Sequence, residues 1–342
     1  MSDARPCTHV TLSGIAVILT HMPDLPPRPE TPRNAAFRRE FYRRWGKENW
    51  IVAGKSRRAE YSPHRQTLSI KSVYQGCEHY YLDNRRLSVT DETYLILNED
   101  REYSSLLEAP QGAMSFCIFF RPGMAGEVAS ASLMTTAQAL DAASELTARP
   151  MEFSEHLRRH DESISPVLRY IQHHVQLGVA DAGWYEEQFE YLLGRMLRNE
   201  RRLQLLPERV SCMSKSKRRE LMRRLQWSTD FMHSNLHREL TLTDLARAAR
   251  LSNFHYLRLF RQVFQMTPMS YLRKQRTDRA LALLSATSMD IQDIAEQVGF
   301  SRLALWRNVK RSIGEGPLRL RQRKAEEIAA QQIVDRDTAR SE

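Results

Sequence analysis

The sequence has no apolar run long enough to cross a membrane and no recognisable export signal. Its longest early run, Ile15–Leu19, falls far short of the roughly 20 apolar residues that a transmembrane helix needs. No basic segment followed by an apolar stretch precedes this run, as a signal peptide would require. We therefore expect a protein that does not enter the membrane and that acts in the cytoplasm.

Cysteine and histidine are too scattered to suggest a disulfide framework or a metal site. The chain has four cysteines (Cys7, Cys77, Cys117 and Cys212), and no two of them form a CxxC pair. Structural and catalytic metal sites normally draw on clustered Cys, His and acidic ligands. We therefore predict no metal, no cofactor and no enzymatic activity.

The chain is long enough for two domains, and its positive charge lies mostly at one end. It has 342 residues, 42% of them hydrophobic, and a net charge of +10. Residues 211–320 hold 20 Lys and Arg against 9 Asp and Glu, so this third carries +11 and the rest of the chain −1. This asymmetry is typical of a phosphate-binding surface, although a solvated basic surface would have the same composition.

The N-terminal half has the pattern of a flexible arm followed by short strands. Residues 1–35 predict the arm, because Pro23, Pro26, Pro27, Pro29 and Pro32 interrupt regular structure. Strands are predicted at Leu68–Tyr74, in a hairpin over Glu78–Val89 that turns at Asp83-Asn84, at Tyr94–Leu97 and at Phe116–Phe120. Short strands at this spacing predict a small barrel or sandwich, in a domain over 36–206.

Two helices are predicted after the strands. Ser165-Pro166 has the pattern of an N-cap followed by proline at the first helical position. The helical apolar stripes consist of Val167, Leu168, Ile171 and Val175, and of Phe189, Leu192, Leu193, Met196 and Leu197. These stripes could cover the barrel or form the seam of a homodimer. A polar, basic linker is predicted over 207–219, and a charged tail over 324–342.

A repeat carries the strongest functional signal: residues 241–271 recur 49 positions later as 290–320. Thr241 and Asp290 are both good N-cap residues, and Ser252 and Ser301 are a second pair. Asp244 and Asp293 occupy the third position of the first helix in each copy. Apolar pairs share the same spacing: Leu242/Ile291, Leu245/Ile294, Ala246/Ala295, Ala249/Val298, Tyr256/Leu305 and Phe260/Val309.

Each copy predicts a helix-turn-helix unit, over 241–264 and 290–313, whose second helix enters the major groove of double-stranded DNA. The outward residues of these second helices are the predicted DNA contacts: Asn253, Phe254, Leu257, Arg258, Arg261, Arg302, Leu303, Trp306, Arg307 and Lys310. Arginine suits bidentate contact with guanine, and apolar side chains suit thymine methyl groups. Trp306 and Leu257 could instead pack against a neighbouring helix.

A single helix over 268–284 is predicted to connect the units. At 1.5 Å per residue it would be about 25 Å long, which with the flanking units places the two reading helices about one turn of DNA apart. Its basic residues, Arg273, Lys274, Arg276 and Arg279, could pair with Asp278, support the fold or reach phosphate.

These residues resemble the AraC/XylS family of bacterial transcriptional regulators over about Leu225–Arg323. The resemblance rests on Leu245-Ala246, Leu251-Ser252, Arg258-Leu259-Phe260, Met266-Thr267-Pro268, Tyr271-Leu272, Arg276, Ala280-Leu281, Ile291, Ile294-Ala295, Val298-Gly299-Phe300-Ser301 and Pro317. It implies a seven-helix domain over 220–323 that binds promoter DNA and usually activates transcription beside RNA polymerase. Three positions depart from the family pattern: Ser301 directly follows Phe300, Val309 replaces an aromatic residue, and Gln265 replaces glycine.

The N-terminal half more distantly resembles the cupin-like sensor domains of that family, in Ser69-Ile70-Lys71, Gly76, Glu78-His79-Tyr80, Asp83, Arg85-Arg86-Leu87 and Leu95–Asn98. Such domains bind a small-molecule effector or mediate dimerisation, and Tyr61, His64, Tyr74, His79 and Tyr81 are candidate effector-pocket residues. His64 and His79 are isolated, without the HxH pair of metal-binding cupins. The whole chain is therefore expected to be α+β, with a cupin-like barrel, covering helices and an all-α DNA-binding domain.

The leading hypothesis is a sequence-specific transcriptional regulator, with activation the expected output. A non-specific or architectural DNA-binding protein is one alternative, and it predicts equal affinity for random and promoter DNA. A cupin-type enzyme with an accessory DNA-binding domain is the other, and a metal analysis with an oxygenase assay would detect it.

Overall fold

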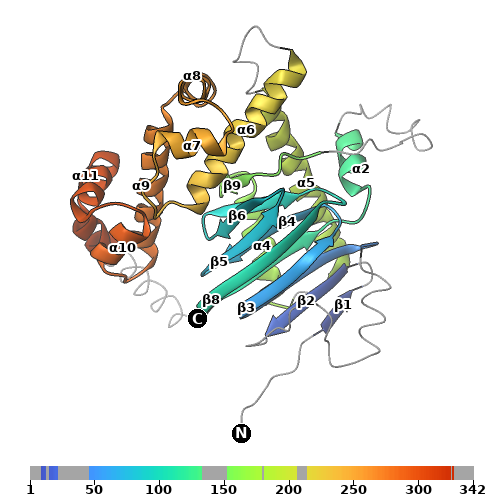
Figure 1. Ribbon diagram of the computed structural model, residues 1–342. Helices are drawn as coiled ribbons and strands as arrows, with labels where there is room; N and C mark the ends of the chain where they lie inside the picture. The colour runs from blue at the N-terminus through green and yellow to red at the C-terminus, as the bar shows by residue number, and fades with distance from the viewer. Residues whose placement is uncertain are drawn as a thin grey trace. The chain divides into compact units, whose positions relative to one another are not determined.

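The computed structural model describes residues 9–12, 15–21, 46–132, 152–178, 181–205, 214–324 and 326. The chain divides into two compact units, one ending at Gln226 and one beginning at Trp227. The first contains the strands and the second only helices (Figure 1). The division lies within helix α6 (Lys215–Ser234). The linker predicted over 207–219 is therefore helical from Lys215 onward, which corrects that prediction.

A nine-stranded sheet forms the first unit, and its two longest strands lie side by side. Strands β3 (Asn49–Arg65) and β8 (Glu102–Phe119) pair antiparallel along most of their length. On the far side of β8, its C-terminal half pairs with β4 (Ser69–Tyr74) and its N-terminal half pairs with β5 (Cys77–Leu82). Because one strand belongs to two neighbouring ladders, the sheet curls into a nearly closed barrel.

The predicted hairpin is confirmed. Strand β5 pairs with β6 (Arg85–Thr90), and Leu82 lies opposite Arg85. Both turn residues have positive φ angles, 49° at Asp83 and 59° at Asn84. Two successive left-handed residues are the requirement of a two-residue type I′ turn, and Asp and Asn tolerate that conformation better than most side chains.

Strands β1 (His9–Leu12) and β2 (Ile15–His21) correct the prediction of an arm over 1–35. They pair antiparallel with each other, and β2 runs parallel to β3. The prolines that suggested an arm begin only at Pro23, after β2 has ended. The apolar, β-branched run Ile15–Leu19 is instead typical of a strand. Residues 22–45, which include those prolines, lie outside the described part of the chain.

Both faces of the central strands are buried, so these strands contribute alternate residues to two cores. Strand β7 (Thr93–Leu97) shows this clearly: Tyr94 and Ile96 belong to one cluster, and Leu95 and Leu97 to the other. The second cluster, which includes Val73, Tyr80, Leu87 and Leu107, lines the inside of the barrel. The outer cluster lies between the sheet and the helices of this unit.

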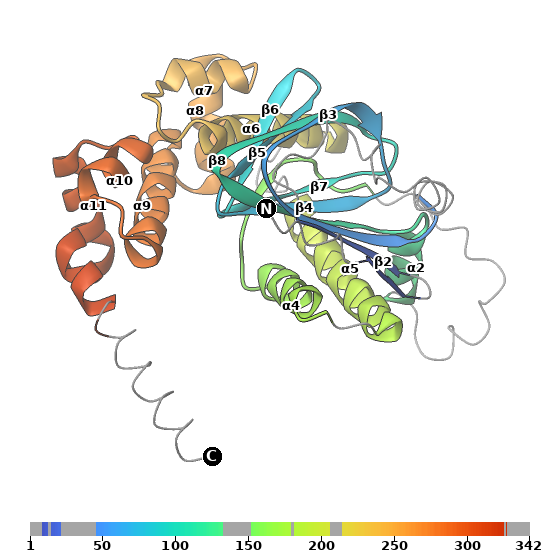
Figure 2. The ribbon, with the colours of Figure 1, turned by 90° about the horizontal axis from the view of Figure 1, so that it is seen from below.

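Helices α2 (Met124–Ala131), α4 (Ser165–Gln176) and α5 (Ala182–Leu205) cover the outer face of the sheet (Figure 2). The two apolar stripes predicted over 167–197 are buried in the outer core cluster. Of the two interpretations of these stripes, packing against the barrel is therefore confirmed, and a dimer seam made by the same side chains is excluded. Helix α4 begins at Ser165, with Ile164 as N-cap, one residue earlier than predicted.

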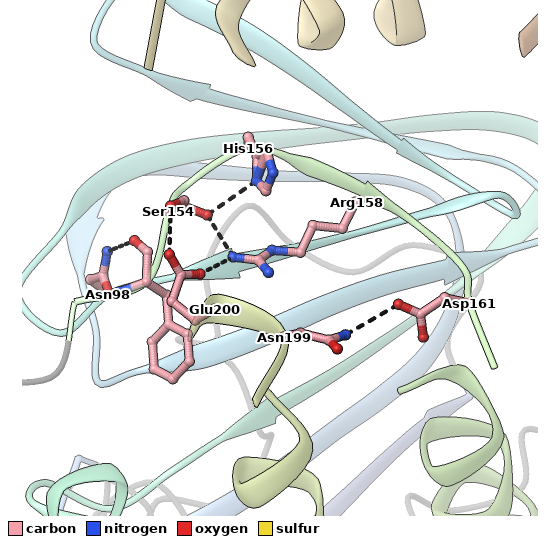
Figure 3. A network of polar contacts seen from close by, with 8 residues as sticks. Asn98, Ser154, His156, Arg158, Asp161, Asn199 and Glu200 are labelled. Carbon is pink, nitrogen blue, oxygen red and sulfur yellow. Dashed lines mark hydrogen bonds and ion pairs between the residues drawn. The ribbon is translucent and has the colours of Figure 1, made fainter. Parts of the chain in front are cut away.

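A polar network fastens strand β9 (Leu157–Arg159) and its flanking residues to α5 (Figure 3). The Arg158 guanidinium donates to Glu200 Oε2 at 2.6 Å, and these side chains are only 6% and 2% exposed. The Ser154 hydroxyl donates to the other oxygen of Glu200 at 2.6 Å. At the end of β7, the Asn98 side chain donates to the backbone oxygen of Phe153 and accepts from its backbone N–H, both at 2.8 Å. The network connects three segments that are far apart in the sequence.

The second unit contains α7 (Leu242–Ala248), α8 (Asn253–Phe264), α9 (Pro268–Ala286), α10 (Ile291–Gln297) and α11 (Arg302–Ile313). Residues 317–324 form one more helical segment. The end of α9 packs with α10 and α11 in a core that includes Leu284, Ile294, Val298, Leu305 and Val309. Of the charged tail predicted over 324–342, only residues 324 and 326 are described.

Candidate DNA-binding surface

The first helix of each helix-turn-helix unit begins at the predicted cap. Thr241 Oγ1 accepts a hydrogen bond from Asp244 N, and the Asp244 carboxylate accepts one from Thr241 N, so α7 starts with a full capping box. These bonds to the ionised form hold the pKa of Asp244 below its ordinary value. In the second helix-turn-helix unit, Asp290 accepts a hydrogen bond from Gln292 N at 2.7 Å. Both first helices are therefore fixed at their N-termini by side chains that the repeat predicted.

The two turns repeat the same backbone geometry. Arg250 and Gly299, 49 positions apart, have φ angles of 53° and 75°. The next residue then donates back into the preceding helix, from Leu251 N to Ala246 O at 3.0 Å and from Phe300 N to Ala295 O at 2.8 Å. Although Ser301 follows Phe300 directly, the second turn is thus closed in the same way as the first.

Serine caps the second helix of each unit. Ser252 accepts from His255 N at 3.4 Å, and Ser301 accepts from Ala304 N at 3.2 Å. The buried sides of these helices are Tyr256, Leu259, Phe260 and Val263 in α8, and Leu305 and Val309 in α11. Tyr256 also donates from its hydroxyl to Ser228 Oγ of α6 at 3.1 Å. Because these sides are buried, the opposite side of each helix faces solvent.

Nine of the ten predicted DNA contacts are exposed on those outward faces, and Leu257 is half-buried: Asn253, Phe254, Arg258 and Arg261 on α8, and Arg302, Leu303, Trp306, Arg307 and Lys310 on α11. Phe254 is 79% exposed, Leu303 57% and Trp306 45%. Large apolar side chains this exposed are unusual beside arginines on a solvated face and are typical of a contact surface.

The arginines of this face are available for a ligand. Within the described part of the chain, Arg258, Arg261, Arg302 and Arg307 form no ion pair with Asp or Glu. Lys310 lies 4.7 Å from the centroid of the Trp306 ring. The Trp306 ring lies close to Gly316, where an added Cβ would be 3.0 Å from the indole Nε1. The alternative that Trp306 and Leu257 pack against a neighbouring helix stays a prediction.

The connecting helix α9 starts, as predicted, at Pro268, after a Thr267 cap that accepts from Ser270 N at 3.1 Å. Gln265, which stands where the family has glycine, adopts the left-handed conformation with φ 57°. Lys274 pairs with Asp278 at 3.2 Å.

Arg276 has a structural role within the second unit. Its Nε donates to Leu236 O at 2.9 Å, another of its nitrogens donates to Arg238 O, and its guanidinium lies 5.8 Å from the Phe300 ring centroid. Burial lowers the pKa of this guanidinium. Arg276 thus joins the loop before α7 to the turn of the second helix-turn-helix unit, and two of its nitrogens donate to backbone oxygens.

The candidate effector residues do not converge on one pocket. Tyr61 packs against the core inside the barrel, and the His64 ring lies 4.5 Å from that of Tyr103. Tyr74 packs against the outer core cluster instead. His79 and Tyr81 alternate with Tyr80 and Leu82, which face the inside, so these two side chains point outward. Tyr74, His79 and Tyr81 therefore do not line the barrel interior.

Polar side chains that sequence reasoning missed do face the interior: Ser69, Lys71, Glu78 and Ser115. The alternation of the strands was visible in the sequence, but not which face of the sheet encloses the interior. Within the described residues, no group of three or more His, Cys, Asp or Glu could hold a metal ion. No described helix is both long and apolar enough to span a membrane.

Comparison with known proteins places the second unit among regulatory DNA-binding domains. A helix-turn-helix family model matches residues 245–335. The lactose operon transcription activator of Staphylococcus xylosus is 33% identical over 76 residues, which are 22% of this chain and 27% of that protein. The regulator AlkR of Acinetobacter baylyi is 31% identical over 108 residues, covering 28% of this chain and 35% of that protein.

Among solved structures, an AraC-type transcriptional regulator from Chromobacterium violaceum is 27% identical, covers 30% of this chain and 92% of that chain, and has a TM-score of 0.28. The chain spans only about a quarter to a third of the length of the curated relatives that it matches. The C-terminal part of this chain is a helix-turn-helix domain of the AraC type.

Proposed function

We propose that the protein is a sequence-specific transcriptional regulator that reads two successive major grooves of promoter DNA with α8 and α11. The observation that carries this proposal is the repetition, at a 49-residue offset, of a rigidly capped helix whose outward face holds unpaired arginines beside exposed apolar side chains. Arg258 and Arg307 occupy equivalent positions midway along their helices.

The chemistry of the two faces supports base reading as well as phosphate binding. Bidentate contact between arginine and guanine contributes about 1–3 kcal/mol of discrimination, and exposed apolar groups can contact thymine methyl groups. A surface for phosphates alone would need only the positive charge. Phe254, Leu303 and Trp306 are therefore the part of the surface that favours a specific over an architectural DNA-binding protein.

The length of α9 supports simultaneous reading. With 19 residues and a rise of 1.5 Å per residue, the connector is about 28 Å long. Adjacent major grooves on one face of DNA are about 34 Å apart. A connector close to that length, between two units of the same geometry, suits an operator with two half-sites one helical turn apart.

The N-terminal barrel is proposed to be a cupin-like sensor that responds to a small molecule. The output is proposed to be activation beside RNA polymerase, in keeping with the name of the lactose operon transcription activator, which is similar to this chain over 76 residues. Because the apolar stripes of α4 and α5 are buried within one chain, a homodimer would have to use other residues.

The test compares Arg258→Ala with Arg273→Ala, which removes the same charge from an exposed position on the connector. Operator DNA would first be selected from a random library with the full-length protein. We expect Arg258→Ala to lose about 1–3 kcal/mol of preference for that operator over random DNA, while Arg273→Ala weakens both about equally. Equal loss on both DNAs in Arg258→Ala would instead identify Arg258 as a phosphate contact.

A further inference from the structure

One strand brings two unsatisfied polar side chains into the interior of the barrel. Along β4, Ile70 belongs to the outer core cluster and Val73 to the cluster inside the barrel. Because side chains alternate along a strand, Ser69 and Lys71 share the inward face with Val73. Ser69 is 0% exposed and Lys71 is 2% exposed.

Lys71 has aromatic neighbours and no acceptor for its ammonium group. Its Nζ lies 3.7 Å from the centroid of the Phe119 ring and 5.2 Å from that of Tyr103. Within the described residues, no hydrogen bond or ion pair involves this nitrogen. An ammonium group carries three donors, and burying its charge without an acceptor is energetically costly.

The neighbouring acidic groups, Glu78 and Cys117, do not pair with the Lys71 ammonium. Glu78, on the neighbouring strand β5, accepts a hydrogen bond from Ser115 Oγ at 2.9 Å and forms no ion pair with Lys71 within 4.0 Å. Cys117 lies directly opposite Lys71 in the ladder between β4 and β8. Burial raises the pKa of the Cys117 thiol, so that this group is neutral near pH 7 and supplies no negative charge.

The hydroxyl of Ser69 is a second orphan on the same face. It is buried and has no hydrogen-bond partner among the described residues. Buried hydroxyl groups nearly always have a partner, so an orphan beside an unpaired ammonium indicates a place for an added acceptor. The rings of Phe119 and Tyr103 offer an apolar wall next to it.

We propose that the interior of the barrel binds a small organic carboxylate, whose oxygens accept hydrogen bonds from Lys71 Nζ and Ser69 Oγ and whose apolar part lies against Phe119 and Tyr103. This inference rests on the proposed sensor role of the N-terminal unit. It names the chemical class of the effector: a carboxylate neutralises the buried ammonium, which a neutral acceptor does not.

Binding would be measured directly by calorimetry and thermal unfolding, on the full-length protein without DNA. The probes are phenylacetate and hexanoate, each with its primary amide as the uncharged match. We expect at least one acid to bind and to raise the unfolding temperature while its amide does not. Lys71→Met should weaken that binding at least tenfold, and Ser69→Ala several-fold. Lys55→Met, which removes an exposed lysine of β3, should leave it unchanged.

The unliganded variant separates a binding role from a structural one. Lys71→Met should unfold at the same temperature as the wild type or higher, because it replaces an unpaired buried charge with an apolar chain of similar length. The proposal is overturned if neither acid binds, if an amide binds as well as its acid, or if Lys71→Met binds the acid normally. Any of these results with an intact operator footprint would leave the DNA-binding proposal standing.

Discussion

Burial of Lys71 makes the stability of the protein depend on pH in a specific direction. Burial lowers the pKa of its ammonium from 10.5 to about 8. Between about pH 8 and 10.5 the unfolded chain keeps a proton at this side chain that the folded chain has lost. The free energy of unfolding contributed by Lys71 therefore rises over that interval, and below pH 8 the side chain is at its most destabilising.

Lys71→Met should remove this dependence. We expect it to raise the free energy of unfolding at pH 7 by at most on the order of 3 kcal/mol, a gain that shrinks towards pH 10. Denaturant unfolding of both proteins at several pH values measures the difference. A gain that stays constant from pH 7 to pH 10 would contradict the burial of a charged lysine.

Glu200 is a second buried charged residue, and its ion pair with Arg158 affects the stability of the protein. Removing one partner of a buried ion pair leaves the other charge uncompensated, at a cost of about 3–5 kcal/mol. We expect Glu200→Ala to destabilise the protein by that amount, since Arg158 and Ser154 both lose their acceptor. Denaturant unfolding measures the change.

Two further variants test the origin of that cost. Glu187→Ala, on an exposed position of the same helix, should change stability by no more than about 0.5 kcal/mol. The double variant Arg158→Met with Glu200→Leu should recover most of the loss, because it removes both charges. If Glu200→Ala were as mild as Glu187→Ala, the pair would not be buried in solution.

At the scale of elements, the turn of the second helix-turn-helix unit depends on glycine. Gly299 has φ 75°, and a Cβ there would lie well inside van der Waals contact with the Leu236 backbone oxygen and close to the Arg276 guanidinium. Gly314 has φ 81° at the end of α11, where a Cβ would meet open space. The two glycines therefore share the backbone strain that alanine introduces, but only Gly299 adds a clash.

Gly299→Ala is expected to lower the local stability of α10 and α11 by about 2–4 kcal/mol. Gly314→Ala should cost about 1 kcal/mol, the strain of a left-handed alanine alone. Hydrogen exchange of the amides in these helices reports both values on the full-length protein. Equal effects of the two substitutions would show that the Leu236 loop can move away from the turn.

The elements that sequence reasoning predicted well are those whose signal is local. Asp83-Asn84 predicted a tight turn, and the Ser and Thr caps at 241, 252 and 301 predicted helix starts, because each depends on a few adjacent residues. Strands β1 and β2 were not predicted, because the prolines that follow them from Pro23 onward suggest an irregular segment. The long strand β8 extends through Pro110 and Gly112, which sequence reasoning takes as breaks.

The barrel interior could not be predicted because both faces of its sheet are buried. An alternating strand such as β4 predicts one buried face, and a lysine within it is ordinarily assigned to solvent. Here the helices cover the face that carries Ile70, so that Lys71 turns into the barrel. The candidate pocket residues were predicted from their aromatic or histidine side chains, which do not reveal which face of the sheet they occupy. Of the five, only Tyr61 and His64 lie near that interior.

At the scale of the whole molecule, the helical unit combines a repeat with a rigid spacer. The 49-residue offset was readable in the sequence, and the structure adds that the two turns close with equivalent hydrogen bonds despite the direct Phe300-Ser301 junction. Equivalent geometry in both units predicts that both bind DNA, and not only the first.

A hydroxyl-radical footprint on the selected operator, at about 0.15 M salt with excess random DNA, tests this most directly. We predict two protected patches on one face of the duplex, separated by one helical turn of about 34 Å. In Arg307→Ala the patch of the second unit should weaken while the patch of the first persists. A single patch that is unaffected by Arg307→Ala, or protection that random DNA abolishes, would contradict reading of DNA by both units.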